Sequence, residues 1–465
     1  MSKRLLFFLC VAIFFVSIGF SFYADISPHA DAKAYNHIGW NLARGIGYIE
    51  NEELANPYDD DAIFRIGPGY EFFLAGIYRV AGIFLEKGDA YAPYAERPYP
   101  LKFPWQMVWI AHAFLRALTA LLLFKIALLV FPDHQKKEWI GFSAAAIFGF
   151  FPDLILINGF LLYETLLLFW GVAAIYFSLK TISNPLYTIH YTLYASLSWS
   201  LAVLTRPSEL LSFLVFPAVL VWQKNWRAAL VSFLFPLLLV GGWSLRNSLF
   251  YGQPLFTTTA GAYALWVGNN ENANGEYDRP AELKEARSAL HSTELSSLSM
   301  RHVAQFIRDD PLKFIGLQIR KTMIYFSFIR PTGFWPEFEN TPGKRLAIVV
   351  SSALATALLF ILSANGMWLL WEKREYLFLV LFWFVAAKPL AIIPLYVETR
   401  YRYSIYPLLA FFAAFALIEF FTSSFRTRHI KTWGIALLAF FCITIIDAAY
   451  VFDKVIAHIP LLLSF

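Results

Sequence analysis

The carboxylates with the clearest chemical potential lie next to long apolar stretches of the sequence. Asp31 follows the first such stretch, with Asp25 shortly before it, and Glu164 and Glu398 border later ones. A carboxylate in such a place can take the proton of an attacking hydroxyl group. Asp31 also begins a predicted helix, where an aspartate N-cap contributes roughly 1 kcal/mol of stability without any catalysis. The residue types therefore leave both roles open for Asp31, with Asp25 as the alternative base.

Arginines accompany these carboxylates. Arg65, Arg206, Arg400 and Arg402 lie at or near the ends of apolar stretches, where a charge is costly and is therefore a functional candidate. A guanidinium group binds two phosphate oxygens at once, which would suit an anionic substrate tethered to a membrane. Simpler roles also fit: Arg65 could anchor its loop at lipid headgroups, Arg206 could belong to an ordinary helix start, and Arg400 and Arg402 could pair with Glu398.

The elements that hold these residues are predicted to be membrane-spanning helices. The sequence is 58% hydrophobic and 15% charged, and its mean hydropathy of +0.54 is far above that of a soluble domain. We predict an all-α polytopic membrane protein with about eleven spans of roughly 20 mainly apolar residues. They lie near 5–23, 105–131, 139–156, 161–180, 191–204, 209–222, 228–245, 346–371, 377–396, 403–421 and 432–450.

Basic residues predict the orientation of these spans. With Lys3 and Arg4 inside, every second loop is also inside and carries lysine or arginine, as the positive-inside rule requires. The formal net charge of +5 is then largely a topology signal and needs no nucleic-acid partner. Residues 1–24 resemble a signal peptide, but we interpret them as an uncleaved first span because the rest of the chain is polytopic.

The first outer loop, roughly residues 24–104, is expected to carry interfacial helices. Residues 31–44 have helical spacing of apolar positions and end at Gly45. Residues 68–84 form a second apolar run, and a further span there would move the later basic loops to the outside. We therefore expect this run to lie along the membrane surface.

The largest polar region, 246–345, is expected to form a small helical cap on the same outer face. A third, short outer segment lies at 398–403 between two spans. The chain then divides into an N-terminal membrane module, an outer region and C-terminal membrane helices, at 1–245, 246–345 and 346–465 respectively.

The sequence lacks the motifs of several other kinds of chemistry. The sequence has neither G-x-x-x-x-G-K-[ST] nor a strand-borne G-x-G-x-x-G, so no nucleotide-binding loop is predicted. His29 and His37 have no ligand-spaced partners, and the run Asp59–Asp61 is more typical of a solvated loop than of a metal site. We therefore expect no metal site and no required cofactor. Cys10 and Cys442 both lie in apolar spans and say nothing about the cellular compartment.

A series of short motifs runs in order through nearly the whole chain: Asp31-x-x-x-Tyr35, Arg65-x-x-Pro-Gly-Tyr70, Leu162-Tyr-Glu164, Leu204-Thr-Arg-Pro207, Arg246-Asn…Tyr-Gly-x-Pro254, Gly268-Asn-Asn270 and Glu398-Thr-Arg-Tyr-Arg…Pro407. In this order they resemble membrane glycosyltransferases of the C-type (GT-C) fold. The nearest groups are the bacterial protein O-mannosyltransferases of glycosyltransferase family 39 and the aminoarabinose transferases of lipid A.

The resemblance implies a glycosyltransferase of the bacterial inner membrane that works on its periplasmic face, on glycans of the cell envelope. It would move a hexosyl or pentosyl group from a polyprenyl-phosphate donor to a hydroxyl of a lipid, glycan or protein, with inversion at C1. Asp31 is then expected to be the base. The other expected site residues are Arg65, Arg206, Arg400 and Arg402 at the donor phosphate, with Tyr35, Glu164 and Glu398 in support.

The sequence departs from this family at two points. Ala32 stands where many relatives have a second acid, which weakens any metal-dependent or protein-mannosylating role, and Glu71 stands where relatives often have proline. Two other functions stay open. A polysaccharide polymerase or ligase would use a diphosphate-linked glycan, and a lipid or solute transporter would need ionisable groups at mid-bilayer depth, such as Lys388.

Overall fold

The computed structural model describes residues 3–51, 60–64, 67–82, 102–184, 188–330, 342–373, 376–421, 430–450 and 452. Every regular element in these ranges is helical, with no strand among them. Seven of the described helices are long and apolar enough to cross a membrane, and two shorter apolar helices accompany them. The predicted all-α polytopic membrane architecture is thereby confirmed.

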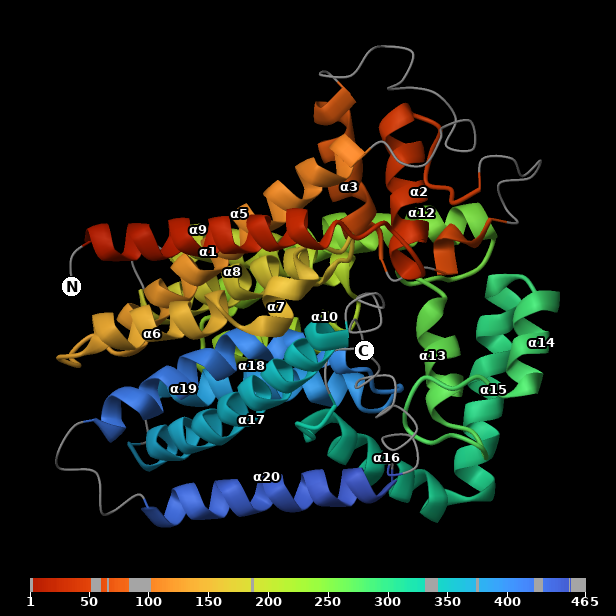
Figure 1. Ribbon diagram of the computed structural model, residues 1–465. Coiled ribbons are helices and arrows are strands. Elements are labelled where there is room, and N and C mark those ends of the chain that lie inside the picture. Colours follow the sequence, from red (N-terminus) through yellow and green to blue (C-terminus); the bar gives the residue numbers. More distant parts are fainter. Residues whose placement is uncertain are drawn as a thin grey trace.

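Long helices lie side by side in one bundle (Figure 1). Each predicted span falls on one or more of α1 (Lys3–Ala24), α5 (Lys102–Val130), α6 (Lys137–Gly149), α7 (Pro152–Ile157), α8 (Glu164–Ser183), α9 (Thr188–Thr205), α10 (Glu209–Trp222), α11 (Trp226–Val231), η5 (Pro236–Gly241), α12 (Gly242–Tyr251), α17 (Pro342–Lys373), α18 (Tyr376–Ile392), α19 (Tyr406–Phe420) and α20 (Ile430–Tyr450).

Two predicted spans are interrupted. The span expected at 139–156 divides into α6 and α7 just before Pro152, because proline lacks an N–H donor and disfavours a helical conformation in the preceding residue. The buried guanidinium group of Arg116 donates to the carbonyl oxygens of Gly149 at 2.7 Å and Leu154 at 2.6 Å at this break. The span expected at 228–245 contains the π-helical segment η5.

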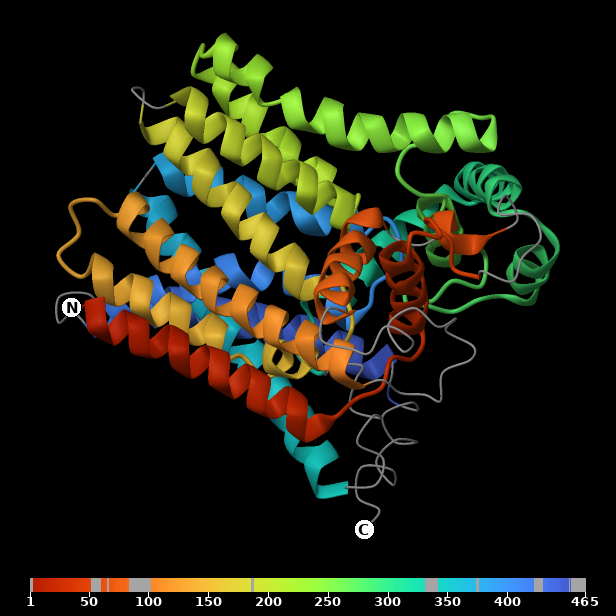
Figure 2. The same cartoon turned by 90° about the horizontal axis from the view of Figure 1, so that it is seen from above.

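The outer-loop helices lie at one end of the bundle, opposite the N-terminus (Figures 1 and 2). Helix α2 (Asp31–Arg44) ends as predicted at Gly45, which has a φ of 82° and donates to the carbonyl oxygens of Asn41 and Leu42. Helix α3 (Pro68–Gly82) packs against it. Both helices run across the direction of the bundle, as expected for interfacial helices (Figure 1).

Four helices form the outer region at the same end: α13 (Ala260–Gly268), α14 (Ala281–Ala289), α15 (Ser292–Asp309) and α16 (Pro311–Phe326). The first three share a hydrophobic cluster of their own, which includes Trp266, Leu283 and Leu295. This arrangement agrees with the expected helical cap, while the three domain boundaries stay predictions.

Candidate functional site

A cavity of about 490 Å³ lies at this outer end of the bundle. Its walls come from the start of α2, the loop after α7, the segment before α14, the end of α16 and residues 397–402. Charged residues of both signs line it, together with apolar ones. They are the carboxylates Asp31, Glu276 and Glu398, the arginines Arg330, Arg400 and Arg402, and side chains such as Phe160 and Ile324.

Asp31 faces this cavity from the first turn of α2. The N-cap position is occupied by Ala30, and the Asp31 carboxylate instead accepts a hydrogen bond from Nη2 of Arg400 at 2.6 Å. The interpretation of Asp31 as an N-cap is therefore wrong. The Asp31 side chain is 41% exposed, so its carboxylate can reach a molecule bound in the cavity.

Arg400 lies among three carboxylates. Besides Asp31, its Nε donates to Glu398 at 2.8 Å, and its Nη1 lies 3.9 Å from Oε1 of Glu164. Glu164 begins α8 and its side chain is only 1% exposed. Neither of its carboxylate oxygens has a hydrogen-bond partner among the described residues. Arg400 therefore supplies the nearby positive charge that a buried carboxylate requires.

Arg206 is buried and stacks on aromatic rings. Its guanidinium carbon lies 4.2 Å from the ring centre of Tyr401 and 5.6 Å from that of Tyr163. The Tyr401 hydroxyl in turn donates to the hydroxyl of Tyr396 at 2.8 Å. Arg206 therefore supports the segment that carries Arg400, because its guanidinium group packs against the ring of Tyr401 in that segment.

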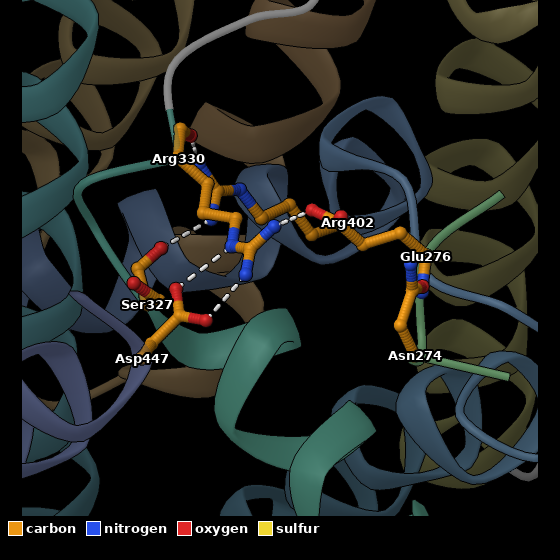
Figure 3. A network of polar contacts seen from close by, with 6 residues as sticks. All are labelled: Asn274, Glu276, Ser327, Arg330, Arg402 and Asp447. Carbon is orange, nitrogen blue, oxygen red and sulfur yellow. Dashed lines mark hydrogen bonds and ion pairs between the residues drawn. The ribbon is translucent and has the colours of Figure 1, made fainter. Parts of the chain in front are cut away.

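Arg402 lines the cavity, but its donors are largely used by the backbone. Nη1 donates to the carbonyl oxygen of Ser327 and Nη2 to that of Arg330, each at 2.6 Å (Figure 3). In this arrangement Arg402 fixes the backbone that follows α16. Arg65, the remaining arginine expected at the donor phosphate, lies outside the described residues.

Tyr35 is buried one turn along α2 from Asp31. Its ring makes edge-on contacts with Tyr70, with centroids 5.8 Å apart, and with Tyr163 at 6.2 Å. Burial raises the pKa of Tyr35 well above its usual value, and the nearby Asp31 charge raises this pKa further. Burial likewise raises the pKa of Tyr277, in the cavity wall, to about 12. Both phenols therefore stay protonated near neutral pH, which leaves the carboxylates as candidate bases.

Arg330 lines the cavity and pairs with Asp447, and neither was among the predicted site residues. Asp447, on α20, accepts from Nε of Arg330 at 2.7 Å and from Nη2 at 2.5 Å (Figure 3). Nη1 of Arg330 forms an ion pair with Glu276. One signal was available, because Asp447 is the only charged residue in the apolar stretch 432–450, and a lone charge in a span calls for a partner.

The Gly268-Asn-Asn270 motif joins the outer region to the cavity. A Cβ atom on Gly268 would lie 2.0 Å from the carbonyl oxygen of Leu395, so only glycine allows this close backbone contact. Asn269 donates to the carbonyl oxygen of Pro394 at 2.8 Å and accepts from Nζ of the buried Lys321 at 2.9 Å. The motif thus holds the segment that leads into Glu398 and Arg400.

The described residues contain no group of three His, Cys, Asp or Glu side chains that could hold a metal. The expectation that the protein needs no metal or cofactor stays a prediction. For Asp60 the solvated-loop interpretation is wrong, because its buried carboxylate accepts from the backbone N–H groups of Glu50, Asn51 and Ala62 at 2.7 to 2.8 Å. Asp60 thus orders the first outer loop.

No protein-family model and no curated protein matches this sequence. Among solved structures, it is similar to the oligosaccharyltransferase AglB from Archaeoglobus fulgidus in complex with an inhibitory peptide and a dolichol-phosphate. The two share 16% identity with a TM-score of 0.51, over 96% of this chain and 56% of that one. The apo form of the Archaeoglobus fulgidus oligosaccharyltransferase gives 16% identity and a TM-score of 0.53, over 97% and 55%.

ArnT from Cupriavidus metallidurans, bound to undecaprenyl phosphate, gives 14% identity and a TM-score of 0.35, over 89% of this chain and 76% of that one. The present chain spans little more than half the length of the archaeal oligosaccharyltransferase. The structural similarity to that enzyme confirms the fold that the motif order predicted. This chain has the GT-C fold of membrane glycosyltransferases.

Proposed function

We propose that this protein is a membrane glycosyltransferase that moves a sugar from a polyprenyl-phosphate donor to an acceptor hydroxyl. The observation that carries the proposal is the exposed Asp31 carboxylate beside Arg400 in a cavity at one end of the bundle. One structural neighbour of the same fold is described in complex with a dolichol-phosphate, which supports a lipid-linked donor. The working face would be the periplasmic side of a bacterial inner membrane, in keeping with the basic loops at the other end.

In the proposed reaction, Asp31 takes the proton of the acceptor hydroxyl as its oxygen attacks C1 of the donor sugar. The new C1–oxygen bond forms on the face opposite the phosphate, so the configuration at C1 inverts. The bond between C1 and the phosphate oxygen breaks, and the polyprenyl phosphate leaves with the electron pair. Arg400 lines the same cavity and would offset the negative charge that develops on this leaving group.

The transporter alternative rests on charges inside the bundle. Lys388 was the main candidate, and its Nζ lies 2.6 Å from Oε2 of Glu209, with both side chains buried. This pair joins α18 to α10 and satisfies the Lys388 charge without a transported ion, which supports the enzyme over the transporter. The polymerase alternative predicts a diphosphate-linked donor, so an assay that offers both kinds of donor separates the two enzymes.

The experiment is sugar transfer by the purified protein in lipid nanodiscs, with undecaprenyl-phosphate sugars as donors and extracted envelope lipids and glycans as acceptors. Asp31→Asn is expected to lower the transfer rate by at least about 100-fold, the usual contribution of a general base. Asp309→Asn, on the exposed end of α15, is the matched control and should keep the wild-type rate. Asp25→Asn examines the alternative base. Full transfer by a folded Asp31→Asn protein would overturn the assignment.

A further inference from the structure

The guanidinium group of Arg330 is held along one edge. Asp447 binds this edge with both carboxylate oxygens (Figure 3), and its side chain is only 2% exposed within the bundle. Arg402 fixes the backbone carbonyl oxygen of Arg330 itself. Because the guanidinium group is planar and rigid, holding one edge also sets the direction of the other. Arg330 also lines the cavity.

Glu276, which lines the same cavity, binds the other edge of Arg330 through its ion pair with Nη1. It lies on the irregular segment between α13 and α14, and its side chain is 24% exposed. A carboxylate and a phosphate present similar oxygens to arginine. An anionic ligand could therefore take the place of the Glu276 carboxylate at Arg330 if only the loop that carries Glu276 moved. Displacing the Asp447 carboxylate would instead require a change in helix α20.

Arg400 shows the same arrangement on its side of the cavity. It has one buried carboxylate neighbour, Glu164, and two more exposed carboxylate partners that line the cavity, Asp31 and Glu398. Each arginine is thus backed by a buried carboxylate and faced by a carboxylate that a ligand can displace. This repetition sets the pair apart from Arg206 and Arg402, whose guanidinium groups contact tyrosine rings and backbone carbonyl oxygens.

We propose that Arg330 is a phosphate-binding residue of this cavity, acting together with Arg400, and that Glu276 occupies its binding edge when the phosphate is absent. The inference rests on the proposed function, because the phosphate in question is that of a polyprenyl-phosphate donor or product. Asp447 is a positioning residue that directs Arg330 towards the cavity. The phosphate that replaces Asp31 at Arg400 also leaves that carboxylate free to accept a proton.

The experiment measures the binding of undecaprenyl phosphate to the full-length protein in nanodiscs, with phosphatidic acid as a second probe that carries the same phosphate on a glycerolipid. Glu276→Gln is expected to tighten binding of undecaprenyl phosphate several-fold, because it removes the competing charge. Arg330→Gln should weaken binding by about tenfold or more, the effect of losing a hydrogen bond to a charged group. Arg301→Gln, on the exposed face of α15, is the control for a lost positive charge.

Unchanged or weaker binding by Glu276→Gln would overturn the proposal, and this variant removes the charge of the side chain while keeping its size. The Glu276→Gln measurement therefore tests the proposal even if the Arg330→Gln protein fails to fold. Asp447→Asn alone should weaken binding of undecaprenyl phosphate. Combined with Arg330→Gln it should weaken binding no further, whereas a merely structural role of Asp447 would make the double variant bind more weakly than Arg330→Gln alone. If the wild-type protein bound undecaprenyl phosphate and phosphatidic acid with equal affinity, this would count against the proposed function. The effect of Glu276→Gln on the binding of phosphatidic acid would still test Arg330 as a phosphate-binding residue.

Discussion

Asp31 follows directly on a residue with an unusual backbone. Ala30 has φ 46° and ψ −125°, a conformation that glycine adopts readily and that costs an alanine of order 1–3 kcal/mol. Such strain persists only where the surrounding structure enforces it. Here it lies between the end of the first span and the carboxylate that we propose as the base, and it sets the direction in which α2 begins.

Ala30→Gly is therefore expected to raise the thermal unfolding temperature, because the strain disappears while the local fold is kept. Ala34→Gly, four residues along in α2, should lower it, since glycine inside a helix costs roughly 1 kcal/mol relative to alanine. Thermal unfolding of both variants in detergent provides the comparison. If Ala30→Gly lowered the unfolding temperature as much as Ala34→Gly, the backbone of Ala30 would not be strained.

Lys321 provides a prediction about pH. Burial lowers the pKa of Lys321 to about 7, and its ammonium group contacts the oxygens of Asn269, Gln318 and Pro394. The unfolded chain keeps the ordinary pKa of about 10.4 and so binds more protons between these values. The free energy of unfolding should therefore rise from pH 7 to pH 10.

Unfolding temperatures measured from pH 6 to pH 10 examine this prediction. Lys321→Met should flatten the rise, and Lys313→Met, on the exposed side of the same helix, should leave it in place. The same slope in wild type and Lys321→Met would show that Lys321 does not cause the dependence.

Individual residue roles were only partly predictable from the sequence. Asp31 could be chosen because its place after the first span follows from local pattern. The contacts of Arg206 and Arg402 could not be foreseen, because tyrosine rings and carbonyl oxygens more than 40 residues away in the chain occupy their guanidinium groups. Sequence position indicates that a charge lies near the membrane surface, but the direction of its side chain depends on the packing of distant segments.

Helix boundaries were predicted best where a local signal was strong. The bounds of α2 were correct because Gly45 takes the left-handed conformation that ends a helix. The break between α6 and α7 was missed, although Pro152 marks it, because the apolar pattern continues through the break. Hydropathy measures how apolar a stretch is and is insensitive to a local interruption of its hydrogen bonds.

At the level of elements, the close approach of α13 to residues 394–397 is open to experiment. Gly268→Ala would place a Cβ atom within 2.0 Å of a carbonyl oxygen, so α13 must move away and the segment before Arg400 must shift. We expect a lower unfolding temperature and a lower rate of sugar transfer. Gly261→Ala, in the same helix, is the matched control, since no described atom lies within 4 Å of its added carbon. Equal behaviour of the two variants would contradict this role of Gly268.

Across the whole molecule, residues far apart in the sequence meet at a few buried ion pairs. Lys388 and Glu209 join α18 to α10. Removing one partner of such a pair leaves an uncompensated buried charge, which costs about 3–5 kcal/mol. Glu209→Gln is therefore expected to destabilise the protein more than the double change Glu209→Gln with Lys388→Met. Denaturation of wild type, both single variants and the double variant gives the coupling energy, and additive effects would exclude a coupled pair.

The overall architecture was more predictable than the outer end that holds the cavity. Spans and basic loops depend on composition and spacing along the chain and were enough to predict a polytopic all-α membrane protein, whereas the GT-C fold was predicted from the resemblance of the motif order to a known family. The pairing of Arg330 with Asp447 depends on how α16 and α20 meet, and no local pattern records that contact. The predicted domain boundaries also cut across the cavity, whose walls come from all three parts.

The pairing of Asp31 with Arg400 also bears on how the protein is made. These residues are 369 positions apart, so at ordinary rates of synthesis the carboxylate waits roughly 20 to 75 seconds for its arginine. During that time an aspartate at the membrane surface is stabilised by water and needs no partner. Arg400, which becomes buried, meets a carboxylate that is already in place. The chain thus produces the residue that tolerates solvent first, and the cavity acquires Arg400 only as the last helices are inserted.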